Sequence, residues 1–374
     1  MLVFHTPLSL SHDPPNEILS GCAQPYFESP ARVTRIVSAL LDPESRDGSE
    51  FEERCCDWTK EDVASDAALL QAVARVHDPL YLDFLREIYD EWIEEGGSKE
   101  AALPETFLRH DLLLEPDHPA RNYSVDAIAR IGRHSFDLSA PVTADTWAAA
   151  LASARVALEA LSALTSSTAD ATFALCRPPG HHATDSLCGG YCYLNNAAVA
   201  ARQFQHNRGT KAKVAILDID YHHGNGTSKI FYNDPSVLYV SLHAWADYPY
   251  YTGAEQERGG PDAKGMNINY PLPRGCSNDE YILTLLKAVN NVRRFAPELL
   301  IVSLGVDTYI RDPITDFCIT LETYPEVGRT IAQIERPTLF VMEGGYCMDA
   351  IGECVRSVLA GFQEEARDLA ELSE

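Results

Sequence analysis

The sequence is short of basic residues and has no long apolar stretch. Its 374 residues carry 30 Lys and Arg against 55 Asp and Glu, a formal net charge of −25. Because a phosphate-binding surface needs clustered Lys and Arg, we expect no nucleic-acid partner. Apolar runs such as 299–306 fall far short of the ~20 residues that span a bilayer, so we expect no membrane association. The acidic balance favours cationic ligands, and it also serves solubility.

Other absences bear on compartment and mechanism. The ten cysteines are scattered, and the first residues lack a basic segment followed by a long apolar one. We therefore expect a reducing, cytoplasmic location. The sequence contains no Gly-x-Ser-x-Gly elbow, His-Glu-x-x-His, Walker loop or zinc-type Cys-x-x-Cys pairs. It therefore does not support the enzyme and zinc-site classes that those motifs mark.

Short apolar runs in the second half of the chain predict strands that are buried on both faces. They are 172–176, 214–217, 237–242, 299–304 and 338–342. Helical patterns lie ahead of these runs and between most of them: 62–92, 143–164, 196–205, 280–295 and 324–334. Thr143 is the expected N-cap of the second helix, and 42–57 and 94–126 are expected loops. This alternation predicts an α/β fold with a doubly wound, mostly parallel sheet.

Polar side chains that can bind a metal follow two of these strands. Asp220 and His222 come directly after the strand at 214–217, and Asp307 follows the strand at 299–304. Since residues i and i+2 of a strand point the same way, Asp220 and His222 can face one ion, with Asp307 as a third ligand. Two carboxylates and one imidazole suit catalytic zinc or another divalent metal. An isolated Asp-x-His would more simply form a hydrogen-bonded loop.

Groups suited to proton transfer and oxyanion binding follow other strands. His181 and His182 stand in tandem after Pro-Pro-Gly, which favours a proton-transfer pair. Tyr346 follows two glycines, where the backbone can turn tightly and present a phenol to a developing oxyanion. Standing alone, each would be an ordinary packed residue. Because the carboxyl ends of strands form the site in open α/β sheets, we expect these groups to meet there.

Several segments together resemble the histone deacetylase superfamily, in the family's order. They are Arg-Pro-Pro-Gly-His-His-Ala at 177–183, Gly-Gly-Tyr-Cys-Tyr-Leu-Asn-Asn-Ala at 189–197, Asp-Ile-Asp-Tyr-His-His-Gly-Asn-Gly-Thr at 218–227, Ser-Leu-Gly-Val-Asp-Thr at 303–308 and Glu-Gly-Gly-Tyr at 343–346. The resemblance implies an arginase/deacetylase-type three-layer α/β fold with a central, mostly parallel sheet. It implies one catalytic domain over residues 1–374, with a loop insertion near 96–126. Within the superfamily, 76–85, 173–180 and 304–314 are most similar to acetylpolyamine amidohydrolases.

By matching motif, the resemblance implies one catalytic Zn²⁺ held by Asp220, His222 and Asp307. It also implies one or two structural K⁺ ions. The residues that match the potassium sites are Asp218, Asp220, His222, Ser241 and Leu242 for the first, and the backbone of Phe231 and Val237 for the second.

The resemblance also assigns catalytic roles. His182 is expected to act as general base and then general acid, supported by Asn225. His181 is expected to assist electrostatically, oriented by Asp218, and Tyr346 to stabilise the oxyanion. The residues matching the walls and rim of the substrate channel are Gly190, Tyr191, Tyr248 and Ile314.

The implied reaction is removal of acetyl groups from acetylated amines. Small cationic acetylpolyamines such as N-acetylputrescine, N-acetylcadaverine and acetylspermidine are the expected substrates, and acetyl-lysine in proteins is the alternative. A protein substrate would also fit a nuclear location, and the family allows a homodimer. The sequence departs from the polyamine enzymes at Leu19, Ile128 and Ser139, where an aromatic and two acidic residues are expected. The acidic residues that could act instead are Glu115, Asp117 and Asp126.

Two other functions fit the sequence less well. An arginase-like ureohydrolase would need two Mn²⁺ ions bridged near Asp218, and it would leave the tandem histidines and Tyr346 unexplained. A catalytically silent binding module is disfavoured because all three metal ligands and Tyr346 are intact.

Overall fold

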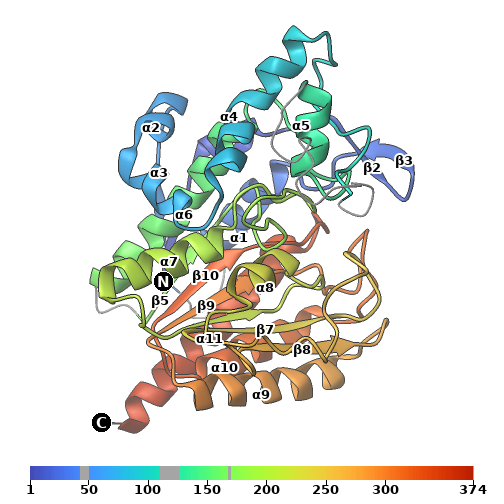
Figure 1. Ribbon diagram of the computed structural model, residues 1–374. Coiled ribbons are helices and arrows are strands. Elements are labelled where there is room, and N and C mark those ends of the chain that lie inside the picture. The colour runs from blue at the N-terminus through green and yellow to red at the C-terminus, as the bar shows by residue number, and fades with distance from the viewer. Residues whose placement is uncertain (43–49, 110–125, 167–169, 374) are drawn as a thin grey trace.

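An eight-stranded sheet runs through the middle of the computed structural model, which describes residues 1–42, 50–109, 126–166 and 170–373 (Figure 1). The strand order is β4-β1-β5-β10-β9-β6-β7-β8, and every neighbouring pair is parallel. The strands are β1 (Leu2–His5), β4 (Glu52–Cys55), β5 (Ala171–Ala174), β6 (Val214–Asp218), β7 (Val237–Ala244), β8 (Asn267–Leu272), β9 (Leu299–Leu304) and β10 (Thr338–Met342). An antiparallel hairpin of β2 (Asn16–Leu19) and β3 (Cys22–Pro25) lies apart from this sheet.

Helices cover both faces of the sheet, which confirms the expected three-layer α/β fold (Figure 1). One face packs mainly against α1, α9, α10 and α11, and the other against α6 and α7. A further group, α2 to α5, packs on α6. The helices are α1 (Ala31–Leu40), α2 (Lys60–Ser65), α3 (Ala67–Ala74), α4 (Pro79–Glu94), α5 (Ala127–His134), α6 (Thr146–Ser166), α7 (Asn196–Arg208), α8 (Asn225–Phe231), α9 (Asn278–Phe295), α10 (Tyr324–Ala332) and α11 (Ile351–Ser373), with 3-10 turns η1 (Pro7–Ser11) and η4 (Leu321–Thr323).

The central strands are apolar throughout because both of their faces are buried. In β6, Val214 and Ile216 enter the core beneath α6 and α7, while Ala215 and Leu217 enter the core beneath α9. Each fully buried Val, Leu or Ile side chain contributes about 1.5–3 kcal/mol relative to an exposed one. This two-sided burial anchors the strand ends that carry the polar residues.

Helix α6 is long and apolar enough to cross a membrane by length and composition alone. In the fold, 67% of its apolar window is buried, against β5, α7 and the α2–α5 group. Packing within the protein therefore accounts for its composition.

Several predicted element boundaries were wrong. Residues 42–57 contain strand β4, whose polar, exposed residues gave no strand pattern. The helical pattern at 62–92 is three helices, because Asp66 caps α3 and Asp78 caps α4 through their side chains. Thr143 is not the N-cap of α6, which begins at Thr146. Within the expected loop at 94–126, residues 110–125 lie outside the described residues, and Glu115 and Asp117 with them.

Candidate active site

The carboxyl ends of β6 and β9 bring the three expected metal ligands together. Asp220 and His222 follow β6, Asp307 follows β9, and one ligand atom from each lies within 4.8 Å of the others. His222 Nδ1 is 3.2 Å from Asp220 Oδ1 and 3.1 Å from Asp307 Oδ2. All three side chains are buried. The two strands are hydrogen-bonded neighbours, so their register holds the ligands at this spacing.

Backbone amides aim the two carboxylates at this point. Asp220 Oδ2 accepts the N–H of Gly344 at 2.8 Å, and Asp307 Oδ1 accepts the N–H of Tyr221 at 2.9 Å. A Cβ at Gly305 would collide with the Asp220 carboxylate, so only glycine permits this approach. The other oxygen of each carboxylate, Asp220 Oδ1 and Asp307 Oδ2, faces His222 Nδ1.

The three members of the trio shift one another's pKa values. Burial raises the pKa of Asp307 to about 6, and the Asp220 charge adds to this shift. Burial acts against ionisation of Asp220 too, but His181 and His222 outweigh it and lower the pKa of Asp220. Burial alone would lower the pKa of His222, yet the two carboxylates raise it to about 10. The two carboxylates therefore favour positive charge between them, which is the electrostatic condition that a divalent cation site requires.

The tandem histidines lie beside the trio, with their ring centroids 4.0 Å apart. His181 Nδ1 donates to Asp218 Oδ2 at 3.2 Å, and His182 Nδ1 donates to Asn225 Oδ1 at 2.7 Å. The His182 and His222 ring centroids are 6.0 Å apart. The structure thus gives both histidines the orienting partners expected from the sequence.

Their surroundings push the two histidines to different charge states. Burial alone would lower the pKa of His181, but Asp220 and Asp218 raise it to about 10. Burial, reinforced by the charge of His181, lowers the pKa of His182 well below its usual value. A cationic His181 thus stands beside a neutral His182, and such divergent pairs mark acid and base assignments. Because Nδ1 of His182 carries its proton, Nε2 is the atom that can accept one.

Glu343 joins the histidine turn to the end of β10, a role that the sequence reasoning missed. Its Oε2 accepts the backbone N–H of Gly180 at 2.7 Å and of His181 at 3.1 Å. Its Oε1 accepts the hydroxyl of Ser303 at 3.1 Å. The motif Glu-Gly-Gly-Tyr contained this residue, but the sequence could not show which loop it holds.

Tyr346 follows a tight turn whose backbone carbonyls accept hydrogen bonds from Arg32. The Arg32 guanidinium donates to the backbone carbonyls of Gly345, at 2.7 Å, and Glu343. It also lies 5.1 Å from the centroid of the Tyr346 ring. Burial raises the pKa of Tyr346 well above its usual value, so the phenol keeps the proton that it would donate.

Two buried arginines share one carboxylate behind this turn. Glu28 Oε1 accepts from Arg32 at 2.6 Å and from Arg177 at 3.0 Å, and all three side chains are almost completely buried. Arg177 also donates to the carbonyls of Ser9 and His12. Glu28 and Arg32 were not predicted, because a single Glu just before α1 and a single Arg in its first turn carry no sequence signal.

The expected channel residues divide into two sides. Tyr191 lies against Tyr346, with ring centroids 5.6 Å apart, and Ile314 packs on the same aromatic cluster. Tyr248 lies against His182, at 4.9 Å between centroids, and against His222 at 5.8 Å. Both tyrosines therefore border the groups expected to react.

Gly190 lies between these two sides. Its φ of +52° favours glycine, and a Cβ there would collide with the His182 ring and crowd the Tyr248 hydroxyl.

A half-buried carboxylate, Asp137, and a fully buried one, Glu17, support the channel tyrosines, and the sequence analysis predicted neither. Asp137 Oδ2 accepts the Tyr248 hydroxyl at 2.6 Å and the Gly190 N–H at 2.9 Å. Glu17 Oε2 accepts the Tyr191 hydroxyl at 2.7 Å. Burial raises the pKa of both acids.

The residues singled out as departures lie elsewhere. The backbone N–H of Ser139 donates to the Asp137 carboxylate at 3.0 Å, and the two residues are two positions apart in the sequence. Ile128 lies in α5, Asp126 caps that helix, and Leu19 ends β2. The acidic residue expected at position 139 is thus absent, but Asp137 supplies an acidic side chain close to that position.

The residues matched to potassium sites fall at two places. Ser241 lies opposite Asp218 in the register of β6 and β7, and Leu242 follows it. Phe231 ends α8 and Val237 begins β7, near the other end of these strands. Asp218 also accepts the Tyr239 hydroxyl at 2.9 Å.

The chain is similar to acetylpolyamine amidohydrolases and to histone deacetylases. Acetylpolyamine amidohydrolase 1 of Pseudomonas aeruginosa is 39% identical over 360 residues, which cover 94% of this chain and 96% of the relative. The crystal structure of an acetylpolyamine aminohydrolase from Burkholderia pseudomallei has a TM-score of 0.84 at 36% identity, covering 98% of this chain and 99% of that one. Histone deacetylase 8 of Arabidopsis thaliana is 35% identical over 58% of this chain and 60% of the relative.

The fold and these relatives define a hydrolase of the deacetylase class. The family model described as the histone deacetylase domain matches residues 26–362. The chain therefore belongs to the histone deacetylase family.

Proposed function

We propose that this chain is a single catalytic domain and a zinc-dependent amidohydrolase that removes acetyl groups from small acetylpolyamines. The observation that carries the proposal is the meeting, at the carboxyl ends of neighbouring strands, of the Asp220, His222 and Asp307 trio with His182 and with the turn before Tyr346, whose Gly344 N–H donates to Asp220. The similarity to enzymes named acetylpolyamine amidohydrolase over most of the chain supports the substrate class.

The trio fits zinc by the chemistry of its donors. Two buried carboxylates and one imidazole are a usual ligand set for a catalytic zinc site, which keeps a position open for water or substrate. Asp220 and Asp307 raise the pKa of His222, which shows that the two carboxylates favour positive charge at this place. When bound, zinc supplies Lewis acidity toward the amide carbonyl and the attacking water.

The two histidines divide the proton transfer. His182 accepts the proton of the attacking water at Nε2 and returns it to the leaving amine. His181 stays cationic between Asp218 and Asp220, so it stabilises negative charge that develops nearby. Asn225 holds His182 in the tautomer that leaves Nε2 free to accept.

Tyr346 donates its phenolic proton to the carbonyl oxygen as the carbonyl becomes an oxyanion. This hydrogen bond strengthens only in the transition state, so it lowers the barrier rather than tightening substrate binding. Arg32 acts through Tyr346 and is a positioning residue, since it contacts the turn and the ring.

The channel favours a cationic substrate. Asp137 and Glu17 place two carboxylates directly behind the wall tyrosines Tyr248 and Tyr191. The net charge of −25 adds a negative field around the opening. Both features attract the distal ammonium of an acetylated diamine, and salt weakens the attraction.

Potassium is proposed for the site matched by Asp218, Ser241 and Leu242. Asp218 is fully buried, and Ser241 lies beside it in the strand register. A monovalent cation there would offset buried negative charge next to the trio. The second site, at the backbone of Phe231 and Val237, is proposed from the resemblance.

The arginase-like alternative has less support. A second metal would need the oxygens of Asp218 as a bridge. Asp218 Oδ2 instead accepts from His181 and Tyr239, while Oδ1 accepts the backbone N–H of Asp220 at 3.3 Å.

The deciding experiment is acetate release by the zinc-loaded enzyme from N-acetylcadaverine and from an acetyl-lysine peptide, at low and high salt. We expect a higher kcat/KM for N-acetylcadaverine and a smaller advantage at high salt. A clear preference for the peptide would replace the polyamine substrate with a protein while leaving the deacetylase chemistry in place. Urea release from arginine would support the arginase-like reaction instead.

A matched pair of substrates isolates the ammonium group. N-pentylacetamide has the chain length of N-acetylcadaverine but no distal charge. We expect Asp137→Asn to reduce the kcat/KM ratio between the charged and the neutral substrate, because the substitution keeps shape and removes charge. Ser139→Ala, two residues away, is the control and should leave the ratio unchanged. An equal loss on both substrates would show that Asp137 only supports Tyr248.

A further inference from the structure

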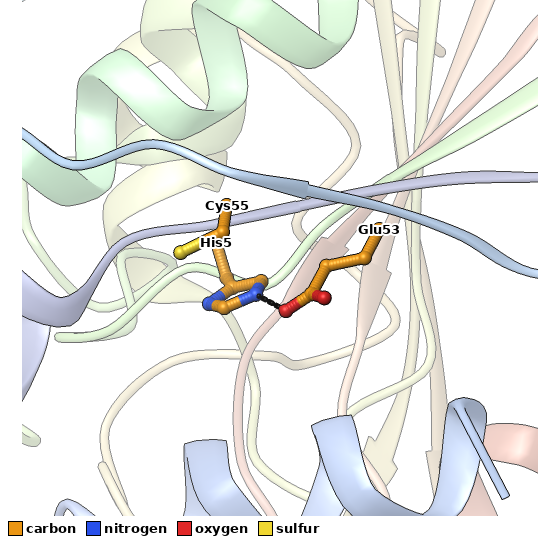
Figure 2. Close-up of side chains that lie close together, drawn as sticks. All are labelled: His5, Glu53 and Cys55. Carbon is orange, nitrogen blue, oxygen red and sulfur yellow. Dashed lines mark hydrogen bonds and ion pairs between the residues drawn. The ribbon is translucent and has the colours of Figure 1, made fainter.

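A second cluster of metal-binding side chains lies at the edge of the sheet, away from the active site (Figure 2). His5 ends β1, and Glu53 and Cys55 lie on the edge strand β4. One ligand atom from each of the three residues lies within 4.8 Å of the others. We propose that His5, Glu53 and Cys55 form a separate site for a borderline divalent cation such as Zn²⁺ or Co²⁺.

The strand register creates this cluster. β1 and β4 are parallel, with His5 paired to Cys55 and Val3 paired to Glu53. Paired residues of neighbouring strands, and residues two apart on one strand, share a face of the sheet. Val3 belongs to the core on the α1 and α11 side, so all three ligands project toward that side. Figure 2 shows the three side chains converging there.

The donor set selects the class of metal. Thiolate, imidazole and carboxylate together suit zinc and similar transition metals rather than Mg²⁺ or Ca²⁺. His5 is buried, whereas Glu53 and Cys55 are exposed, so water can reach the cluster and complete a four-coordinate site. The basic residue between the two β4 ligands, Arg54, pairs with Glu52 and does not occupy the cluster.

Metal binding would rearrange one hydrogen bond. His5 Nε2 lies 2.7 Å from Glu53 Oε1, which is too close for both atoms to ligate one tetrahedral ion at ~2 Å. Figure 2 marks this contact with a dashed line. The exposed Glu53 side chain can move to admit the ion. The Cys55 thiol loses its proton to solvent, and its sulfur lone pair then binds the metal.

The sulfur ligand separates this proposal from the catalytic one. The Asp220, His222 and Asp307 trio contains no sulfur, and its β9 contribution lies four strand spacings from β4, about 19 Å. The chain has other free cysteines, so the signal that reports on the edge cluster is a thiolate signal that depends on Cys55, and it is independent of the proposed function.

The test is a Co²⁺ titration of the metal-free, full-length protein, reduced with a phosphine, followed by near-ultraviolet absorption. We expect a thiolate-to-cobalt charge-transfer band that Cys55→Ser abolishes. Cys56→Ser is the matched control, since Cys56 packs toward the core on the other side of the sheet and should keep the band. Asp220→Ala, which removes a catalytic ligand, should also keep it.

Glu53→Gln checks the carboxylate, and we expect it to weaken Co²⁺ binding at this band at least tenfold. Cys55 and Glu53 are exposed, so both variants should fold, as circular dichroism can show. The proposal is overturned if the wild-type protein gives no band, or if the band persists in Cys55→Ser.

Discussion

Two trios of metal-binding side chains lie on the same sheet and differ in almost every physical respect. The trio of Asp220, His222 and Asp307 lies at the ends of central strands, where it is buried and its carboxylates accept backbone amides. The trio of His5, Glu53 and Cys55 lies at an edge, where two of its members are exposed. Similar side chains therefore acquire different properties from their place in the sheet.

The difference shows what turns ligands into a reactive site. Two strands on one side of the central trio, β5 and β10, lead into the tandem histidines and Tyr346, which are the proposed base and oxyanion donor. Among the residues that the structure describes, no strand lies beyond β4 to supply such groups. The central trio is suited to chemistry, and the edge trio is suited to holding an ion. Substitutions in and around the two trios test this contrast.

The largest effect is expected from Asp220→Ala. Removing one of two buried carboxylates leaves His222 and Asp307 unable to hold a divalent metal, because a three-ligand site loses both charge and geometry. We expect turnover to be abolished and bound zinc to fall by about one ion per chain. Acetate release and elemental analysis measure the two outcomes.

The control for Asp220→Ala is Asp262→Ala, which removes an exposed acid. It should keep both turnover and zinc. A fully active Asp220→Ala enzyme would contradict the assignment of the central trio as the catalytic metal site.

The sequence could predict the centre of the sheet better than its edges. Strands such as β6 and β9 are buried on both faces and read as continuous apolar runs. β4 is exposed at every residue, so its polar sequence resembles a loop. A strand shows an apolar pattern in its sequence because it is buried. The edge strand β4 is not buried, so its sequence has no such pattern.

The candidate site was predictable only in part for a related reason. Asp220 and His222 are close in sequence, so their spacing carries information. Arg32 acts on Gly345 from 313 residues away, and Asp137 acts on Tyr248 from 111 residues away. Such pairs arise from tertiary packing, so no spacing of residues within a short segment predicts them.

The second prediction concerns the buried charges behind the active site. Glu28→Gln removes the only carboxylate found between Arg32 and Arg177 in the described residues, while keeping its shape. Leaving a buried ion without its partner typically costs 3–5 kcal/mol. We expect the free energy of unfolding, measured by urea denaturation, to fall by about that amount. A loss below 1 kcal/mol would show that backbone carbonyls alone satisfy the two guanidinium groups.

The third prediction isolates the oxyanion donor. Tyr346→Phe keeps the ring beside Arg32 and Tyr191 and removes only the hydroxyl. Losing one such donor lowers kcat by ~10²–10³-fold with little change in KM. Tyr26→Phe, in the same aromatic cluster, is the control and should have a much smaller effect. A drop below tenfold for Tyr346→Phe would make it a wall residue.

The smallest effect is expected at the edge trio. Glu53→Gln removes the charge facing His5, at a contact where the Glu53 side chain is 40% exposed. Partly exposed ion pairs contribute about 0–1 kcal/mol, since water and salt screen them. We expect the metal-free variant to lose less than 1 kcal/mol of unfolding free energy by urea denaturation, against about 3–5 for Glu28→Gln. If both variants lost the same amount, the exposed edge would stabilise the fold as much as the buried ion pairs behind the active site, and the contrast between edge and centre would fail. A small loss, together with weaker Co²⁺ binding, would instead mean that Glu53 serves an ion more than the fold.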